Sequence, residues 1–286
     1  SVKRVGEVLD TLPSIVDPLS PQQLPHDATG KIEFKDVTFT YPDADLPVLS
    51  SINFTAEPGQ TTAFIGSTGS GKSTLINLIP RFYDVSAGQI LLDGVDIRQL
   101  KLEDLYDQIG YVPQKGVLFS GTIASNIKYG NAKASQKLVE KSAKIAQAAE
   151  FISELKNGYK NDIAQGGSNV SGGQRQRLSI ARAIAVEPNV YIFDDSFSAL
   201  DFKTDAKLRS ALVKETKHKT VLIVGQRINT IMSADKIIVL DEGKIVGQGT
   251  HQELMEDCEV YQEIAASQLS EDDLQKMSVT TAKGSV

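Results

Sequence analysis

The sequence predicts an α/β fold with a mixed sheet at its core, an antiparallel β subdomain and a helical insertion. Three short apolar runs, at residues 62–65, 190–193 and 221–224, are typical of buried parallel strands. Each run precedes a polar or glycine-bearing loop and then a helical pattern, which is the alternation expected of an α/β domain. Hairpin signals elsewhere predict the antiparallel part, and a long strand-free stretch predicts the insertion.

The bulk composition fits one large globular domain with a subdomain and tails. The chain has 286 residues, of which 41% are hydrophobic and 23% are charged. Its net charge of −6 argues against a nucleic-acid partner, because such proteins normally carry a basic face. The single cysteine, Cys258, cannot form an internal disulfide, which fits a reducing compartment. Every apolar run is far shorter than the ~20 residues that span a bilayer.

The N-terminal segment is predicted to connect the domain to something upstream. Residues 1–12 place their apolar side chains on one helical face, and Pro13 ends that helix. Four prolines within residues 13–30 predict an extended linker. We therefore assign residues 1–30 as a linker, 31–265 as the main domain and 266–286 as a polar C-terminal tail.

The main domain opens with residues that alternate as strands do, at 32–34, 37–41 and 52–56. Two hairpins are predicted by Asp-Gly and Glu-Gly turns between apolar runs, at residues 90–97 and 237–246.

The helical subdomain is predicted at about residues 115–185. One continuous apolar face is expected there, formed by Leu138, Ser142, Ile145, Ala149 and Ile152. Further on, Thr250 and Glu253 form a capping box that opens a late helix.

A phosphate-binding loop follows the first buried strand. The motif G-x-x-x-x-G-K-[ST] is matched at every position by Gly66, Ser67, Thr68, Gly69, Ser70, Gly71, Lys72 and Ser73, and Thr74 follows as part of the same loop. Glycines let backbone N–H groups curl around phosphate oxygens, and the following helix adds a partial positive charge. Lys72 supplies a full charge to the terminal phosphates, and the Ser73 hydroxyl suits Mg²⁺. A nucleoside triphosphate with Mg²⁺ is therefore predicted.

A second candidate anion site lies at the start of another helix, in the sequence Ser171-Gly172-Gly173-Gln174. One nucleotide needs only one phosphate loop, so this segment is predicted to serve a nucleotide held by another subunit. A capped helix with a flexible start is the alternative.

Two adjacent carboxylates, Asp194 and Asp195, end an apolar run and suggest a metal ligand beside a base.

Together these motifs resemble the nucleotide-binding domain of an ABC exporter, a P-loop NTPase, over roughly residues 31–265. The motifs follow the family's order: the phosphate loop, a glutamine loop at 111–114, the signature at 170–174, the two acids, a D-loop at 198–201 and a switch segment at 224–227. The resemblance implies that Tyr41 stacks on adenine, although a core tyrosine is the alternative. It implies that Gln114 contacts Mg²⁺ or the attacking water, although it could instead cap a loop.

The resemblance also implies the remaining roles and partners. Ser73 and Asp194 would hold Mg²⁺, and Asp195 and Gln226 would stand at the catalytic positions. The signature residues would contact the ATP of a second nucleotide-binding domain in a head-to-tail dimer. A transmembrane domain is expected upstream of residue 1, which implies the cytoplasmic face of a membrane and export of a small molecule, drug, lipid or peptide.

Two positions depart from the family's pattern. Asp195 stands where glutamate normally acts as general base, and Gln226 stands where histidine normally grips the terminal phosphate. No other histidine is well placed. His218 precedes the strand that leads to Gln226, His251 begins a late helix and His26 lies in the linker. Smaller departures are Gln165, where an acid is usual, and Val170, where leucine is usual.

These departures predict a site that binds ATP but hydrolyses it slowly. Losing both ideal groups removes about 3–5 kcal/mol of transition-state stabilisation, whereas ATP binding needs neither. The intact signature would complete the site of an unlike partner, as in heterodimeric multidrug-type exporters. The alternatives are a fully active domain of a homodimeric exporter and a soluble ABC-type ATPase not linked to transport.

Overall fold

The computed structural model describes residues 13–268, and at its centre is a six-stranded mixed sheet. The strands are, in spatial order, β12 (Lys244–Gly249), β11 (Lys236–Asp241), β3 (Thr61–Gly66), β10 (Thr220–Val224), β9 (Val190–Asp194) and β6 (Ile109–Val112). All pairs are parallel except β11–β12. The three predicted parallel strands are confirmed as the neighbours β3, β10 and β9. The helix predicted within residues 1–12 lies outside the described residues.

A second, antiparallel sheet packs against the first one. Its strands are, in spatial order, β2 (Leu49–Ala56), β1 (Ile32–Phe39), β4 (Ala87–Leu92) and β5 (Val95–Asp96). Both predicted hairpins are confirmed, as β4–β5 and β11–β12. The separation of residues 32–34 from 37–41 is wrong, because β1 is one strand interrupted by a bulge. The register shifts between Phe34 and Val37, and Asp36 between them has a positive φ of 49°.

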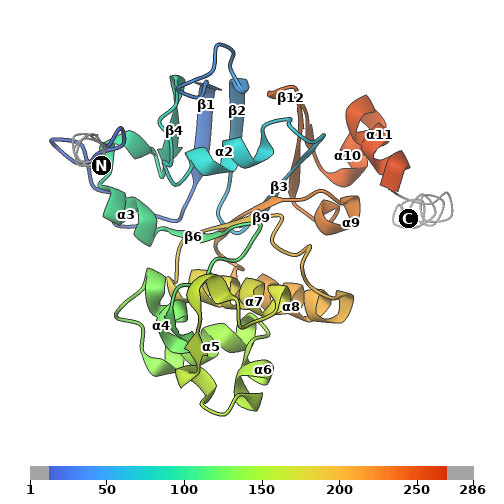
Figure 1. Ribbon diagram of the computed structural model, residues 1–286. Coiled ribbons are helices and arrows are strands. Elements are labelled where there is room, and N and C mark those ends of the chain that lie inside the picture. The colour runs from blue at the N-terminus through green and yellow to red at the C-terminus, as the bar shows by residue number, and fades with distance from the viewer. Residues whose placement is uncertain (1–12, 269–286) are drawn as a thin grey trace, which may run out of the picture.

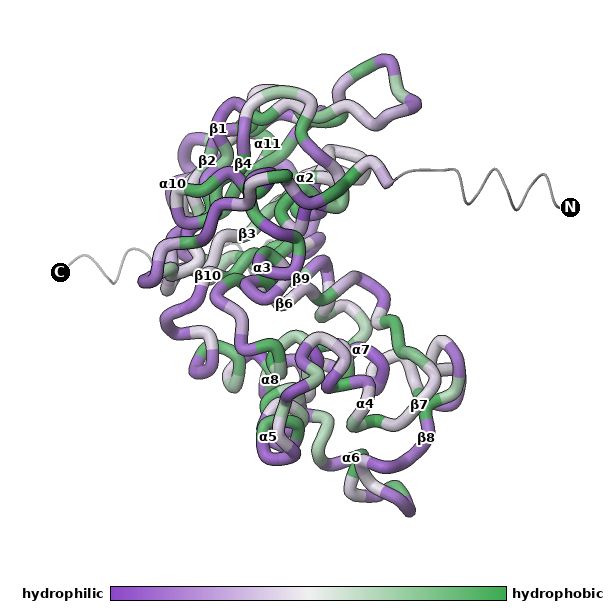
Figure 2. The backbone as a smooth tube through the Cα atoms, turned by 90° about the vertical axis from the view of Figure 1, so that its left-hand side faces the viewer, coloured by the Kyte–Doolittle hydropathy of each residue, from purple (hydrophilic) through white to green (hydrophobic). Residues whose placement is uncertain are grey.

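The two sheets share one hydrophobic core. Phe34 stacks on Phe54 at 4.5 Å between ring centroids, and Phe54 meets the edge of Phe64 at 5.4 Å. The helix that follows β3, α2 (Lys72–Leu78), buries Leu75 and Leu78 completely in the same core. Figure 1 shows β1, β2, β4 and α2 above β6 and β9 of the central sheet, and Figure 2 shows the same order from the side. The phosphate loop thus connects a buried strand to a buried helix.

The opposite side of the central sheet carries the helical subdomain (Figures 1 and 2). Its helices and those that flank it are α4 (Ile123–Ile127), α5 (Gln136–Ile145), α6 (Ala149–Glu154), α7 (Gly172–Ala185) and α8 (Phe202–Glu215). Short 3₁₀ helices are η1 (Ile97–Gln99), η2 (Lys128–Gly130), η3 (Gly158–Lys160) and η4 (Gln165–Gly167). The remaining helices are α3 (Leu102–Asp107), α9 (Ile228–Ile231), α10 (His251–Asp257) and α11 (Glu259–Gln268).

The continuous helical face predicted from Leu138 to Ile152 is wrong in one respect. The segment forms two helices, α5 and α6, because α5 ends in a Schellman motif. Gln147 adopts a left-handed φ of 57°, its N–H donates to the carbonyl of Lys144, and the N–H of Ala148 donates to the carbonyl of Ala143. Val139 and Ala143 are fully buried. The expectation of no strand is also wrong, because β7 (Gly121–Thr122) pairs with β8 (Asp162–Ile163).

The linker segment 13–30 is fastened where it enters the domain. The carboxylate of Asp93, in the β4–β5 turn, accepts hydrogen bonds from the backbone N–H groups of Thr29, Gly30 and Lys31 at 2.9–3.2 Å. The Thr220 hydroxyl donates to the carbonyl of Gly30 at 2.6 Å. The end of the linker is therefore held by both sheets.

The C-terminal helices cover the edge of the central sheet next to β12 and β11. The capping box of Thr250 and Glu253 is confirmed at the start of α10. Tyr261 and Ala265 of α11 are fully buried against β3, β11 and α9. Within residues 13–268, the helices are all too short or too polar to cross a bilayer.

Candidate nucleotide site

The sheet topology brings four loops together at the carboxyl ends of β3, β9, β10 and β6. Such a convergence is where open α/β sheets bind ligands. A cavity of about 510 Å³ lies there. Its lining is Gly66, Ser67, Thr68, Gly69, Lys72, Ser73, Gln114, Asp194, Asp195, Val224, Gln226, Ile264, Ser267 and Gln268. The phosphate loop, both adjacent acids, the glutamine loop and the switch segment therefore face one space.

The phosphate loop surrounds the ammonium group of Lys72. Lys72 Nζ donates to the carbonyls of Gly66 at 2.8 Å and Ser67 at 2.7 Å, and to Ser70 Oγ at 3.3 Å. Burial lowers the pKa of Lys72, while the negative charges of Asp194 and Asp195 partly restore it. A Cβ at Gly66 would lie 2.0 Å from the carbonyl oxygen of Leu240, so only glycine fits there. The loop is a cradle for phosphate with one cation at its base.

Ser73 and Asp194 form the candidate metal position. Ser73 Oγ donates to Asp194 Oδ1 at 3.3 Å. Burial raises the pKa of the Asp194 carboxyl, and the Ser73 hydrogen bond opposes that rise. A hydroxyl and a carboxylate beside a phosphate cradle fit Mg²⁺, which is usually bound by one or two carboxylates together with substrate phosphates. Within the described residues, no cluster of three His, Cys, Asp or Glu side chains offers an all-protein metal cage.

Asp195 is held by two amide groups. Its Oδ2 accepts hydrogen bonds from Gln226 Nε2 at 2.8 Å and from Gln114 Nε2 at 3.2 Å. Its backbone has a left-handed φ of 44°, and its N–H donates to the carbonyl of Val224. Burial raises the pKa of Asp195, and the Gln114 bond opposes this. The three predicted catalytic residues thus form one cluster, in which a short acid is bound by two neutral donors.

Tyr41 lies outside the cavity lining, above α2. Its hydroxyl is 3.0 Å from Thr74 Oγ1, and its ring packs edge-on against Phe39 and Tyr83. The ring is half-buried and joins the edge of the core. Stacking on adenine stays a prediction for this residue.

The signature segment lies on the subdomain side, at the start of α7 (Figure 1). Ser171 caps the helix: its hydroxyl accepts from the Gln174 N–H at 3.2 Å, and its own N–H donates to Gln174 Oε1 at 2.9 Å. A Cβ at Gly172 would meet nothing within 4 Å. Ser171 and Gly172 are exposed and Gln174 is half-buried, and none of the three lines the nucleotide cavity of its own chain.

The sequence profile of the ABC transporter family matches residues 49–198, which is just over half of the chain. The chain belongs to the ABC transporter family. The predicted fold is thereby confirmed, and so is the enzyme class, an ATPase of the ABC transporter type.

Individual relatives agree with this assignment. The chain is 48% identical over 269 residues to an uncharacterized ABC transporter ATP-binding protein of Mycobacterium tuberculosis, covering 93% of this chain and 46% of the relative. It is 44% identical over 245 residues to the ATP-dependent lipid A-core flippase of Vibrio vulnificus, covering 85% of this chain and 42% of the relative. A bacterial Atm1-family ABC exporter structure with ATP bound superposes with a TM-score of 0.89 at 35% identity, covering 94% of this chain and 47% of that chain. The chain thus spans less than half the length of the relatives it matches.

One buried residue of this ABC domain escaped the sequence analysis. Gln176 of α7 is 1% exposed and bridges the glutamine loop. Its Oε1 accepts from the Gly116 N–H at 2.9 Å, and its Nε2 donates to the carbonyl of Pro113 at 3.0 Å. These two backbone groups stand on either side of Gln114. The only signal in the sequence was its place in the helix, five residues after Ser171.

The three histidines lie away from the acids. His218 lies in the turn before β10, at the opposite end of that strand from Gln226. His251 begins α10, where its Nδ1 is 2.7 Å from the Tyr261 hydroxyl. His26 lies in the linker segment.

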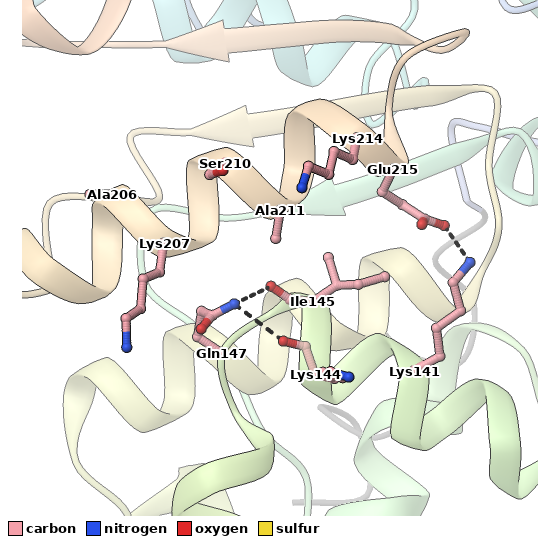
Figure 3. A pocket seen from close by; sticks show the side chains of 10 residues that line it. All are labelled: Lys141, Lys144, Ile145, Gln147, Ala206, Lys207, Ser210, Ala211, Lys214 and Glu215. Carbon is pink, nitrogen blue, oxygen red and sulfur yellow. Dashed lines mark hydrogen bonds and ion pairs between the residues drawn. The ribbon is translucent and has the colours of Figure 1, made fainter.

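A larger groove of about 740 Å³ lies between α5 and α8 and shares no lining residue with the nucleotide cavity (Figure 3). Lys141, Lys144, Lys207 and Lys214 stand around it, and Lys141 pairs with Glu215 at 2.8 Å. No motif residue lines this groove, so it is not assigned to the nucleotide.

Proposed function

We propose that this chain is the ATP-binding domain of a heterodimeric ABC exporter and contributes its slowly hydrolysing site. Mg²⁺-ATP would be held by the phosphate loop, with Lys72 at the phosphates and Ser73 and Asp194 at the metal. The metal would supply positive charge at the transferring phosphate. Closure of the dimer around ATP would drive movement of a transmembrane partner, which places the domain at the cytoplasmic face of a membrane.

The observation that carries this proposal is the pair of hydrogen bonds that Gln114 and Gln226 donate to the Asp195 carboxylate. A general base must reach the proton of the attacking water, and an offset of about 1 Å can cost ~10²-fold in rate. The half-buried Asp195 carboxyl has a raised pKa, which suits a base, so its weakness is reach and not basicity. Gln226 donates a hydrogen bond but, unlike histidine, cannot become a cation or transfer a proton.

The intact signature supports the unlike partner. Ser171 and the open Gly172 present a helix N-terminus on the surface, away from the cavity of the same chain. In a head-to-tail pair these groups would meet the partner's ATP. A weak site and a good signature on one chain are useful together only when the partner has a competent site.

A cluster of exposed apolar side chains supports docking of a transmembrane partner. Val117, Phe119 and Tyr129 are 51%, 41% and 64% exposed, and the Phe119 and Tyr129 rings stack at 4.2 Å. Arg182 holds the cluster together, since its guanidinium lies over both rings and donates to the carbonyl of Val117. The cluster begins three residues after Gln114, so a partner seated there would touch the loop that reaches the nucleotide.

The proposal is tested by comparing ATP binding with ATP hydrolysis in the purified domain. Equilibrium binding of a fluorescent ATP analogue with Mg²⁺ should be tight in the parent and lost in Lys72→Ala. Phosphate release should be slow in the parent at saturating ATP. Brisk turnover of the parent, abolished by Asp195→Ala, would instead identify a fully active domain of a homodimeric exporter.

A further inference from the structure

The last turn of α11 reaches the switch segment (residues 224–227). Gln268 Nε2 donates to the carbonyl of Gln226 at 2.8 Å, and Gln268 Oε1 accepts from the N–H of Ile228 at 2.9 Å. One side-chain amide therefore spans Arg227 and binds the backbone on both of its sides.

Both hydrogen bonds satisfy groups that the local backbone leaves open. Ile228 is the first residue of α9, and the N-cap residue Arg227 makes no side-chain capping bond. The N–H of Ile228 thus belongs to the unpaired donors of a helix start, and Gln268 supplies its acceptor. The same side chain lines the nucleotide cavity with Ser267 and Ile264.

The position of Gln268 is fixed by burial of the helix that carries it. Tyr261 and Ala265 are both 0% exposed, and Gln268 follows them at the spacing that places residues on one helical face. The apolar stripe of α11 packs against Ile228 and Ile231 of α9, so α11 shares a core with the helix that directly follows the switch segment. The Gln268 amide is thus presented to the switch segment by a helix whose inner face is buried.

We propose that Gln268 is a positioning residue of the nucleotide site: by holding the switch backbone, it keeps the Gln226 side chain on Asp195. Gln226 is thus held at both ends, through its carbonyl by Gln268 and through its Nε2 by Asp195. The consequence for catalysis rests on the proposed function, but the contact itself can be measured without turnover.

The test compares Gln268→Ala with Gln262→Ala in the whole chain by NMR. Gln262 is a matched control, because it lies on the same helix and its side chain also donates to two backbone carbonyls, those of Met255 and Glu256. In Gln268→Ala the Ile228 amide should exchange its hydrogen on the order of tenfold faster, and the side-chain amide signal of Gln226 should shift. In Gln262→Ala both should stay as in the parent.

Two results would overturn the proposal. An unchanged Ile228 exchange rate in Gln268→Ala would show that the Gln268 side chain does not hold the backbone of the switch segment. Faster exchange of the Ile228 amide with an unmoved Gln226 signal would show that Gln268 does not position the Gln226 side chain on Asp195. ATP binding, measured on the same samples, tests the proposed function separately from the positioning role of Gln268. A parent that bound no ATP would refute the proposed function, while the exchange result for Gln268 would still hold.

Discussion

The double substitution Asp195→Glu with Gln226→His should convert the slow site into a fast one. Glutamate adds one carbon–carbon bond, about 1.5 Å, to a carboxylate that is now held back between two amides. An offset of that size is worth ~10²-fold or more for a base, and an imidazole adds a proton-carrying group at the terminal phosphate. The double variant should therefore gain about 10²–10⁴-fold in turnover, or about 3–5 kcal/mol.

The assay is phosphate release by the purified domain at protein concentrations that favour pairing, where a second copy supplies its signature segment. Four proteins are needed: the parent, each single variant and the double variant. Because the two substituted side chains contact each other, their effects should be non-additive, with the double gain exceeding the product of the single gains. Adding Lys72→Ala to the double variant should abolish the gain. A double variant that hydrolyses ATP no faster than the parent would refute the reasoning about reach.

Two further predictions concern stability. Gly66→Ala should lower the free energy of unfolding, measured in urea, by more than about 4 kcal/mol, because its Cβ would lie 2.0 Å from the Leu240 carbonyl oxygen. Gly69→Ala, at a residue with φ +85° and open space around it, should lower it by only about 1–2 kcal/mol. Equal losses in the two variants would contradict the role given to the Leu240 contact. Burial lowers the pKa of His251, so the unfolded chain takes up a proton first as the pH falls below about 6.5. The melting temperature should therefore decline between about pH 7.5 and pH 5.5, and His251→Gln should decline less; parallel pH profiles would exclude this role for His251.

The fold was predictable wherever local patterns and tertiary packing agree. The apolar runs at β3, β9 and β10 needed burial on both faces, which a central parallel sheet provides. The family resemblance implied that the phosphate loop shares a site with Asp194 and Asp195, and the sheet explains it, because the parallel strands that carry them end at one edge. The hairpins followed from their turn residues.

What could not be predicted depends on residues that override their usual preferences. Gln147 ends α5 in a left-handed conformation normally taken by glycine, so the break carried no sequence signal. Asp36 likewise forms its bulge with a positive φ. Gln176 and Gln268 act on backbone groups far away in the chain, 60 and 63 residues apart for the first and 40 and 42 for the second. In the sequence, a glutamine that hydrogen-bonds to distant backbone groups cannot be distinguished from any other glutamine on a helix.

In the proposed head-to-tail pair, the side chain of Gln176 connects two surfaces that would face different molecules. The start of α7 points toward whatever sits on the signature, while the glutamine loop points toward this chain's own nucleotide and toward the exposed aromatic cluster. Because the buried Gln176 amide binds the backbone on both sides of Gln114, we expect a tilt of α7 to move Gln114 as well. In that pair, a change at one ATP would reach the other through α7 and Gln176, within a single polypeptide chain.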